Sequence, residues 1–271
     1  MERSRIGIVA IVFLALCMGS VADAKKKKKG KAPKLSAEAK SAVQMLDSKD
    51  QSEVLEGVQT LGDLAEPGGA KALIELLETG PKDKITEAAI DSLGAISNPD
   101  SIPILIEYMN HRRPKVRITA INAIAEIKDK RVAEALKSAL SDSDANVRKA
   151  AAYALGRYGD PSAVDILFKA FDRDVPEAAI AIGQIGGIDA AERLMGYAGK
   201  APLDLLLPGF SEFLGRDDFP TKGKIAVVDR LMELAGPEVK DFLKQYAAGL
   251  PDDADLKLRQ KVQEAIESIA D

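Results

Sequence analysis

The residue types that most often carry out chemistry in proteins are scarce in this chain. It contains one histidine, His111, and one cysteine, Cys17, so no cluster of histidines or thiolates can form a metal site. Carboxylates such as Asp142, Asp144 and Glu177 are numerous, but a carboxylate acts as a general acid or base only beside a suitable partner. Without such a partner, carboxylate residues more often cap helices. The sequence therefore predicts no catalytic residues, no metal site and no cofactor.

The single histidine belongs to a basic stretch, His111-Arg112-Arg113-Pro114-Lys115. Such a stretch could receive an anionic group, but a turn between helices is normally exposed and is often charged for that reason alone. We therefore expect residues 111–115 to form a solvated turn.

Residues 1–24 have the pattern of a secretory signal: a basic start, an apolar run over residues 6–18, and Ala-Asp-Ala at 22–24 as a cleavage site. The apolar run is too short for a comfortable membrane span. We expect an exported, periplasmic protein whose mature chain begins at Lys25 and has no cysteine, which excludes disulfides. An uncleaved signal anchor and lipidation of Cys17 are the alternatives, although Leu16 is larger than a lipidation motif prefers.

Residues 25–34 carry seven lysines and no acidic residue, a composition that predicts disorder. The segment is either a soluble tail or a tether to an anionic membrane or polymer surface, to which each lysine would contribute about 1 kcal/mol. The lysines that would contact such a surface are Lys25, Lys26, Lys27, Lys28, Lys29 and Lys31.

The charge balance of the whole chain does not indicate a nucleic-acid partner. There are 38 basic and 42 acidic residues, interleaved through most of the sequence, and the net charge is −4. Only 4% of the residues are aromatic and there is no tryptophan, so small aliphatic side chains must form the core. A core of that kind suits closely stacked helices.

From about residue 50 the sequence repeats with a period of 31 residues. Residues 92–96, 123–127 and 154–158 occupy the same place in three successive copies, and residues 60–64 precede them by 32. A register that holds across several residue classes indicates stacked equivalent units. Within each copy the apolar residues recur at helical spacing, which predicts a pair of helices.

The turns inside these pairs contain Asn98, Asp129 and Asp160, which we expect to cap the second helix of each pair. Two short helices cannot bury their own apolar faces, so each pair must cover its neighbour. We predict an all-α fold with a cap helix and repeats over residues 35–199. Divergent helices over residues 200–271 would complete it, at 203–214, 222–235, 238–248 and 255–270, with a kink at Pro208-Gly209.

The motif Val147-Arg148, Ala154-Leu155-Gly156 and Gly159-Asp160 resembles the bacterial HEAT-like repeat first associated with phycobilin lyases. The resemblance is firm over residues 50–173. It implies a right-handed α-α superhelix, a solenoid whose second helices line a concave face that holds a partner. Hydroxylases built from similar repeats hold two irons with His-Glu pairs, which a single histidine cannot supply.

On the second helices one repeat position is occupied by Ile74, Ile106, Lys137 and Phe168, and the next by Glu75, Glu107, Ser138 and Lys169. If these face inward, they form an apolar stripe with charged neighbours, as in a protein-binding groove. The alternative is that they seal the core between units.

We therefore expect a non-enzymatic scaffold or adaptor of the bacterial cell envelope that binds a protein or peptide partner on its concave face. A surface tether that uses the lysine segment is one alternative. A lyase-like enzyme is the other, and the mature chain offers it neither a cysteine nor a cluster of titratable residues.

Overall fold

The computed structural model describes residues 35–270. The expectations for the secretory signal, Cys17 and the lysine segment lie outside these residues. The described chain contains fifteen α-helices, two short 3₁₀ helices and a single bridge pair between Ala198 and Ala201. None of the helices in this part of the chain is long and apolar enough to span a membrane. The prediction of an all-α fold is confirmed.

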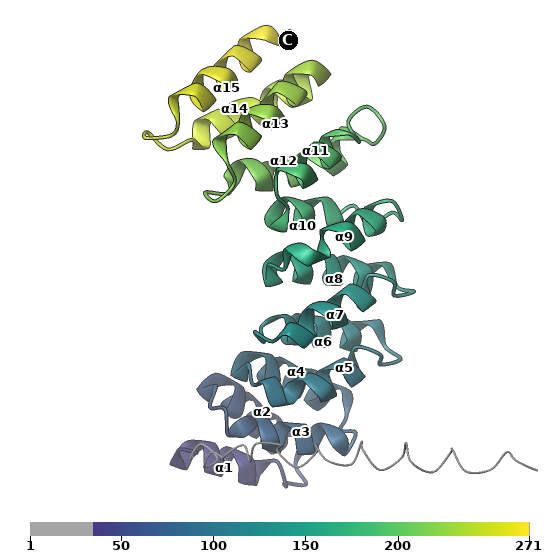
Figure 1. Ribbon diagram of the computed structural model, residues 1–271. Coiled ribbons are helices and arrows are strands. Elements are labelled where there is room, and N and C mark those ends of the chain that lie inside the picture. Colours follow the sequence, from purple (N-terminus) through teal and green to yellow (C-terminus); the bar gives the residue numbers. More distant parts are fainter. Residues whose placement is uncertain (1–34, 271) are drawn as a thin grey trace, which may run out of the picture. The chain divides into compact units, whose positions relative to one another are not determined.

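The helices follow one another along the chain with short connections (Figure 1). Their bounds are α1 Ala37–Met45, α2 Gln51–Leu64, α3 Gly69–Glu78, α4 Asp83–Ile96, η1 Pro99–Ser101, α5 Ile102–Tyr108, α6 Pro114–Ala125, α7 Lys130–Ala139, α8 Ala145–Tyr158, η2 Pro161–Ala163, α9 Val164–Phe171, α10 Ala178–Ile185, α11 Ile188–Met195, α12 Leu203–Gly215, α13 Thr221–Leu234, α14 Pro237–Gly249 and α15 Leu256–Ser268.

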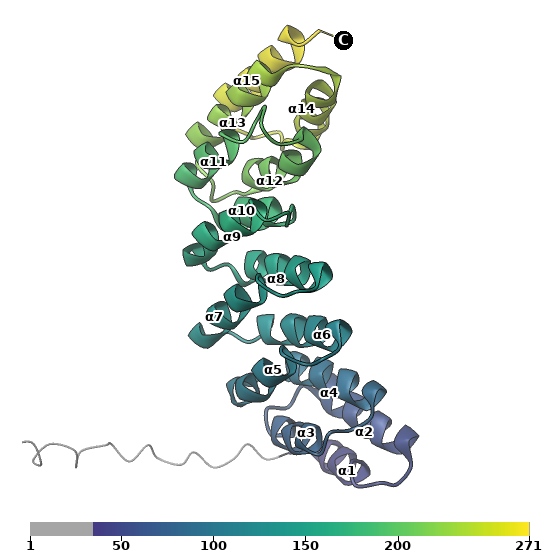
Figure 2. The same ribbon diagram turned by 90° about the vertical axis from the view of Figure 1, so that its right-hand side faces the viewer.

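The helices pair and stack as the repeat predicts. The first helix of each pair packs on the first helix of the next, so α2, α4, α6, α8, α10 and α12 form one continuous row, and α1 packs on α2 at its start. Helices α5, α7 and α9 lie on the other side of the stack (Figure 2). We call the six helices of this row, α2 to α12, the first helices, and we call α3, α5, α7 and α9 the second helices.

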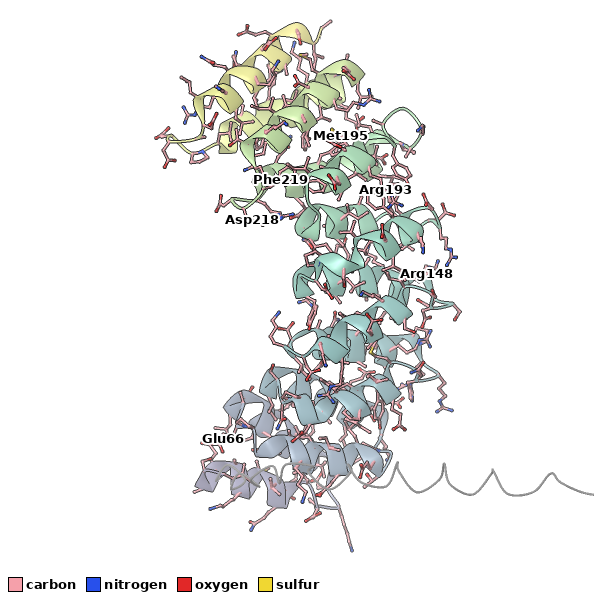
Figure 3. The ribbon with its side chains drawn as sticks, in the orientation of Figure 1. Glu66, Arg148, Arg193, Met195, Asp218 and Phe219 are labelled. Carbon is pink, nitrogen blue, oxygen red and sulfur yellow. The ribbon has the colours of Figure 1, made fainter. Side chains whose placement is uncertain are left out.

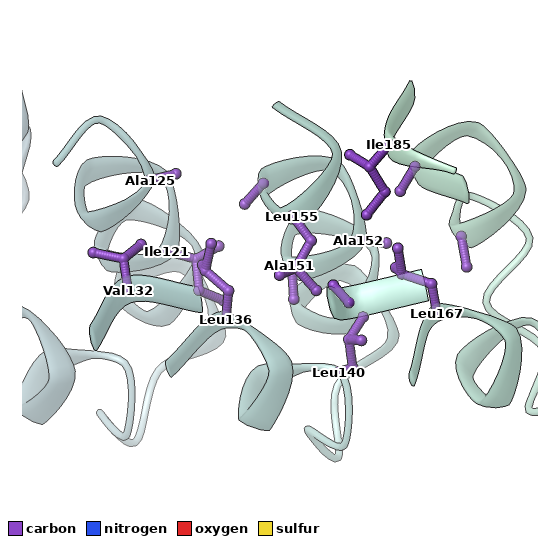
Figure 4. Close-up of a cluster of buried hydrophobic side chains, with 14 of the residues drawn as sticks. Ile121, Ala125, Val132, Leu136, Leu140, Ala151, Ala152, Leu155, Leu167 and Ile185 are labelled. Atoms are coloured by element: carbon purple, nitrogen blue, oxygen red, sulfur yellow. The ribbon is translucent and has the colours of Figure 1, made fainter. Parts of the chain in front are cut away.

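The core is built from residues that recur at the 31-residue period. Leu105, Leu136 and Leu167 hold equivalent positions on α5, α7 and α9, and all three are fully buried. Ile121 and Leu155 meet this layer from α6 and α8 (Figure 4). Burial of each such side chain contributes about 1.5–3 kcal/mol before conformational entropy is counted. The repeat in the sequence is therefore a repeat of core contacts.

The glycine of the recurring Leu-Gly pair allows neighbouring first helices to approach closely. A Cβ atom at Gly94 of α4 would lie 2.8 Å from Cα of Ala123 on α6. A Cβ atom at Gly183 of α10 would overlap the carbonyl oxygen of Gly209 on α12 and lie 2.6 Å from Cβ of Glu212. Ordinary contacts at these positions need 3.4 Å or more. Only a residue without a side chain fits between these backbones.

The predicted caps are present. Asn98 accepts a hydrogen bond from the Asp100 amide at the start of η1, Asp129 from the Arg131 amide of α7, and Asp160 from the Ser162 amide of η2. Pro99 and Pro161 occupy the first helical turn, and at both places a 3₁₀ turn leads into the α-helix. Proline costs little there because its missing N–H would have no partner inside the helix.

The carboxyl-terminal helices α12–α15 match the expected ones within about two residues. Packing continues past residue 200 without a break, because α12 packs on α10 and α13 on α11. Pro208 lies inside α12, which continues to Gly215. Helix α10 has only 8 residues where α8 has 14.

Candidate interaction surfaces

The column predicted on the second helices is not one exposed stripe. Ile74 on α3 is half-buried, whereas Ile106 on α5 is 36% exposed. Lys137 on α7 is largely covered and donates hydrogen bonds to Glu134 Oε1 and Ser162 Oγ, both at 2.9 Å. Phe168 on α9 is fully buried. The expectation that Phe168 presents an exposed anchor is therefore wrong, and of the two alternatives it seals the core.

Two residues from the next unit bury Phe168. The guanidinium of Arg193 lies 3.8 Å from the centroid of the Phe168 ring and also forms an ion pair of 3.0 Å with Asp165 (Figure 3). The Tyr197 ring stacks on Phe168 at 6.1 Å between centroids, and its hydroxyl donates to Asp172 Oδ1 at 2.6 Å. This cover could not be predicted from the repeat, because Arg193 and Tyr197 lie beyond its last clear copy.

The neighbouring column stays on the surface. Glu75, Glu107, Ser138 and Lys169 are all exposed, and Glu75 forms an ion pair of 3.5 Å with Lys71 on its own helix. A cavity of about 320 Å³ lies between α5 and α7 and includes Ile106 and Ser138 from the predicted columns. The second helices thus bring Ile106 and Ser138 together but do not join the remaining candidates into one groove.

A larger groove crosses the first helices. A cavity of about 520 Å³ spans α4, α6 and α8, and one of about 270 Å³ spans α2 and α4. Both cavities are lined by Asp91 and Ala95 of α4 and are therefore adjacent, and together we call them the first-helix groove. Its lining residues are Gln59, Gly62, Asp63, Ala88, Asp91, Ser92, Gly94, Ala95, Asn122, Ala123, Glu126, Asn146, Lys149, Ala150, Tyr153 and Arg157.

The polar residues of the first-helix groove follow the repeat. Gln59, Asp91, Asn122 and Tyr153 stand 32, 31 and 31 residues apart, one on each of the four helices. Within residues 35–270 the side chains of Gln59, Asn122 and Asn146 make no hydrogen bond. Each amide therefore has a free donor and a free acceptor. This column was visible in the sequence, but its exposure was not.

The basic side chains of the groove already have acidic neighbours. Lys149 Nζ lies 2.9 Å from Glu177 of the segment before α10, and Arg157 Nη1 lies 3.3 Å from Glu126 just after α6. Lys149 also lies 5.8 Å from the ring centroid of Tyr153, which is 37% exposed. The α8 end is thus nearly neutral and presents an aromatic ring.

The α2–α4 end is acidic. Asp63 and Asp91 form no ion pair within 4.0 Å in the described chain. Partial burial and the charge of Glu87 raise the pKa of Asp91, and Lys115 offsets only part of this effect because it is paired with Glu87 at 2.7 Å. The surroundings of Asp91 therefore stabilise its ionised form less than water does, mainly because the carboxylate is partly buried and secondly because Glu87 is near.

The Val-Arg pair of the repeat holds a turn and does not line the groove. Arg117 Nη2 donates to Asp142 Oδ1 at 2.7 Å, and Arg117 Nη1 donates to the His111 carbonyl at 2.9 Å. Burial alone would raise the pKa of Asp142, but the hydrogen bonds from Arg117 and Asp144 and the Arg117 charge lower it. His111 Nδ1 accepts from the Arg113 amide at 3.2 Å, so its ring helps to form the turn.

Among residues 35–270 there is no group of three or more histidine, cysteine, aspartate or glutamate side chains arranged to hold a metal ion. The groove carboxylates Asp63, Asp91 and Glu126 lie on successive helices or at their ends and do not converge on a single point. The geometry is that of a surface which contacts a partner at several places.

The fold defines a class, the solenoids of stacked helical hairpins. Within it, a family model for HEAT repeats matches residues 39–113 and 103–181, which together make up more than half of the chain. The chain belongs to the HEAT-repeat family. No curated protein matches it.

Solved structures share this fold. The chain is similar to a homology model of the full-length AP-3 complex in an intermediate open conformation, with a TM-score of 0.57, 15% identity, and coverage of 86% of this chain and 51% of that one. It is also similar to the complex of CpcE and CpcF of phycocyanin lyase from Nostoc sp. PCC7120, with a TM-score of 0.48, 21% identity, and coverage of 89% and 97%. At 15% identity the likeness to the AP-3 complex shows the fold alone.

Proposed function

We propose that this protein is a non-enzymatic scaffold that binds a protein partner through the first-helix groove. The observation that carries the proposal is the groove itself, which crosses four consecutive helices and combines exposed Tyr153 with amide side chains that have no partner in the described chain. An exposed aromatic ring among polar groups is typical of a protein-binding surface. HEAT-repeat proteins are generally scaffolds of this kind.

The shape of the surface supports binding over catalysis. An enzyme site encloses a small substrate and directs several polar groups at one reacting atom. The first-helix groove instead distributes Gln59, Asp91, Asn122 and Tyr153 along a line, one per helix. A line of separate contacts suits a polypeptide better than a small molecule.

We further propose that the scaffold works in the bacterial cell envelope. The support is the secretory pattern of residues 1–24. Cell fractionation combined with determination of the amino-terminal residue of the isolated protein tests this. A mature chain that begins at Lys25 in the periplasmic fraction is expected, and full-length protein in the cytoplasm would contradict it.

Photocrosslinking in the native cell tests the binding role and its location together. p-Benzoylphenylalanine replaces Tyr153 in the groove, Ile106 on the second helices, or Leu256 on α15, which is 68% exposed and serves as the control. We expect one recurrent protein adduct from position 153 and none from position 256. The purified partner should then bind wild type and lose affinity for Tyr153→Ala. An adduct from position 106 alone would mean that the partner binds to the second helices and not to the first-helix groove.

A further inference from the structure

We propose that the occupant of the first-helix groove is an extended, basic polypeptide segment with cationic side chains over α2 and α4 and an apolar or aromatic side chain over α8. This inference rests on the proposed scaffold function and specifies the chemistry of its partner. Four properties of the groove support it: its length, its charge, its free amides and its aromatic end.

The length of the groove fits a short extended segment. It crosses α2, α4, α6 and α8, which are successive neighbours in the stack. Packed helices lie about 8–10 Å apart, so three such steps cover about 24–30 Å. An extended chain advances about 3.3 Å per residue, so about seven to nine residues bridge the groove.

The charge at the α2–α4 end selects a cation. Asp63 and Asp91 are exposed and have no ion-pair partner in the described chain, and Asp91 lies near Glu87, which already holds Lys115. The surrounding sequence is also acidic, since residues 35–110 contain fourteen acidic and five basic residues. A lysine or arginine placed between the two aspartates would neutralise charge that Lys115 offsets only in part at Asp91 and that no ion pair of the described chain offsets at Asp63.

The free amides suit the main chain of an extended segment. Gln59, Asn122 and Asn146 each offer one acceptor and an NH₂ donor, and none uses them on a side-chain bond within residues 35–270. An extended backbone presents unpaired N–H and C=O groups that need such partners when they leave water. These contacts hold the segment without regard to its side chains.

The α8 end does not favour a further cation. Lys149, near the Tyr153 ring, is paired with Glu177, and Arg157 is paired with Glu126, so this end offers no unpaired carboxylate to an added cation. The floor here is Ala123 and Ala150, and the exposed part of the Tyr153 ring offers apolar contact area. An apolar side chain here would gain from burial against the ring, and an aromatic one would gain about 0.5–1.5 kcal/mol more from ring packing.

The test uses random dodecapeptides displayed on phage, selected against the full-length protein at low salt. Enriched sequences should contain two basic residues about three positions apart and an apolar or aromatic residue about five to six positions from the nearer one. Synthetic fluorescent copies are then titrated by fluorescence anisotropy. The expected effects are a loss of roughly tenfold or more in affinity for the double variant Asp63→Asn with Asp91→Asn, and a loss of roughly fivefold for Tyr153→Ala.

The matched control removes the same charge elsewhere. The double variant Glu75→Gln with Glu107→Gln alters two exposed carboxylates on the second helices and should change the affinity less than about twofold. Circular dichroism must first show that all variants keep the helical content of wild type.

Three results would overturn the inference: selection of acidic peptides or of none, equal losses in the two double variants, or low-salt self-association that Asp91→Asn abolishes. The last result would assign the groove to a second copy of the chain. The proposed function is tested separately, because it predicts a photocrosslinked adduct from position 153 whatever the charge of the partner.

Discussion

Substituting Gly183 with alanine tests whether close approach of the first helices stabilises the stack. The new Cβ atom on α10 would overlap the carbonyl oxygen of Gly209 and lie 2.6 Å from Cβ of Glu212. Because ordinary contacts here begin at 3.4 Å, α10 and α12 must separate by about 1 Å or distort. Overpacking of this kind costs about 1–3 kcal/mol, and a clash with backbone falls at the upper end.

Alanine also favours the helix by about 1 kcal/mol over glycine, which offsets part of this cost. The net loss should be about 2 kcal/mol, equivalent to a fall of about 4–8 °C in Tm for a chain of this size. Thermal unfolding followed by circular dichroism gives the Tm. Hydrogen exchange should show the added opening in α10 and α12, because each unit of a repeat protein contacts only its neighbours.

Gly215→Ala is the matched control. Gly215 ends α12, and a Cβ atom there meets nothing within 4 Å, so the substitution should leave stability unchanged or raise it slightly. The reasoning is refuted if Gly183→Ala is as stable as Gly215→Ala, or if its added exchange appears in α2 and α4 instead.

Three further predictions concern charges and turns. Arg117→Ala should lower the free energy of unfolding in urea by about 2–3 kcal/mol, because it leaves the largely covered Asp142 carboxylate without its ion-pair partner. In wild type the ionised Asp142 stabilises the fold at neutral pH, and this contribution should disappear as the pH falls below the usual aspartate range, through the lowered pKa of Asp142. Asp91→Asn should stabilise the protein at pH 7 but not near pH 3, because the raised pKa of Asp91 means that the folded state disfavours its ionised form. Equal Tm values for the variant and wild type at pH 7 would contradict this. Ala65→Gly should raise Tm, with a gain of up to about 1 kcal/mol, because Ala65 caps the end of α2 at a φ of 48°, where an alanine is strained and a glycine is not. Gly159→Ala should lower Tm, because Gly159 has a φ of 83°.

The local structure could be predicted from the sequence because its causes are local. The spacing of apolar residues and the caps at Asn98, Asp129 and Asp160 located the helices, and the 31-residue period fixed which helices stack. Even the divergent helices α12–α15 follow from periodicity alone. The reason for the recurrent Leu-Gly pair appeared only once the distance from Gly94 to Ala123 was known.

The candidate site was less accessible to sequence reasoning. A repeat column shows which residues are equivalent but not which are exposed, so the sequence left open whether Phe168 lies on the surface or in the core, where Arg193 and Tyr197 cover it. The column of Gln59, Asp91, Asn122 and Tyr153 has the same periodicity and lines the larger groove. The charges look interleaved over the whole chain, and this average conceals the acidic excess of residues 35–110.

The single row of first helices also determines how the protein responds to mechanical load. Each helix in the row packs mainly on the one before and the one after, so a tension applied between α1 and α12 passes through every interface in series. In a series arrangement the weakest interface separates first, and the rupture force reports its unfolding rate and not the stability of the whole. Stretched between two attachment points, this chain would extend in discrete steps, one interface at a time, and shorten again as neighbours re-pack.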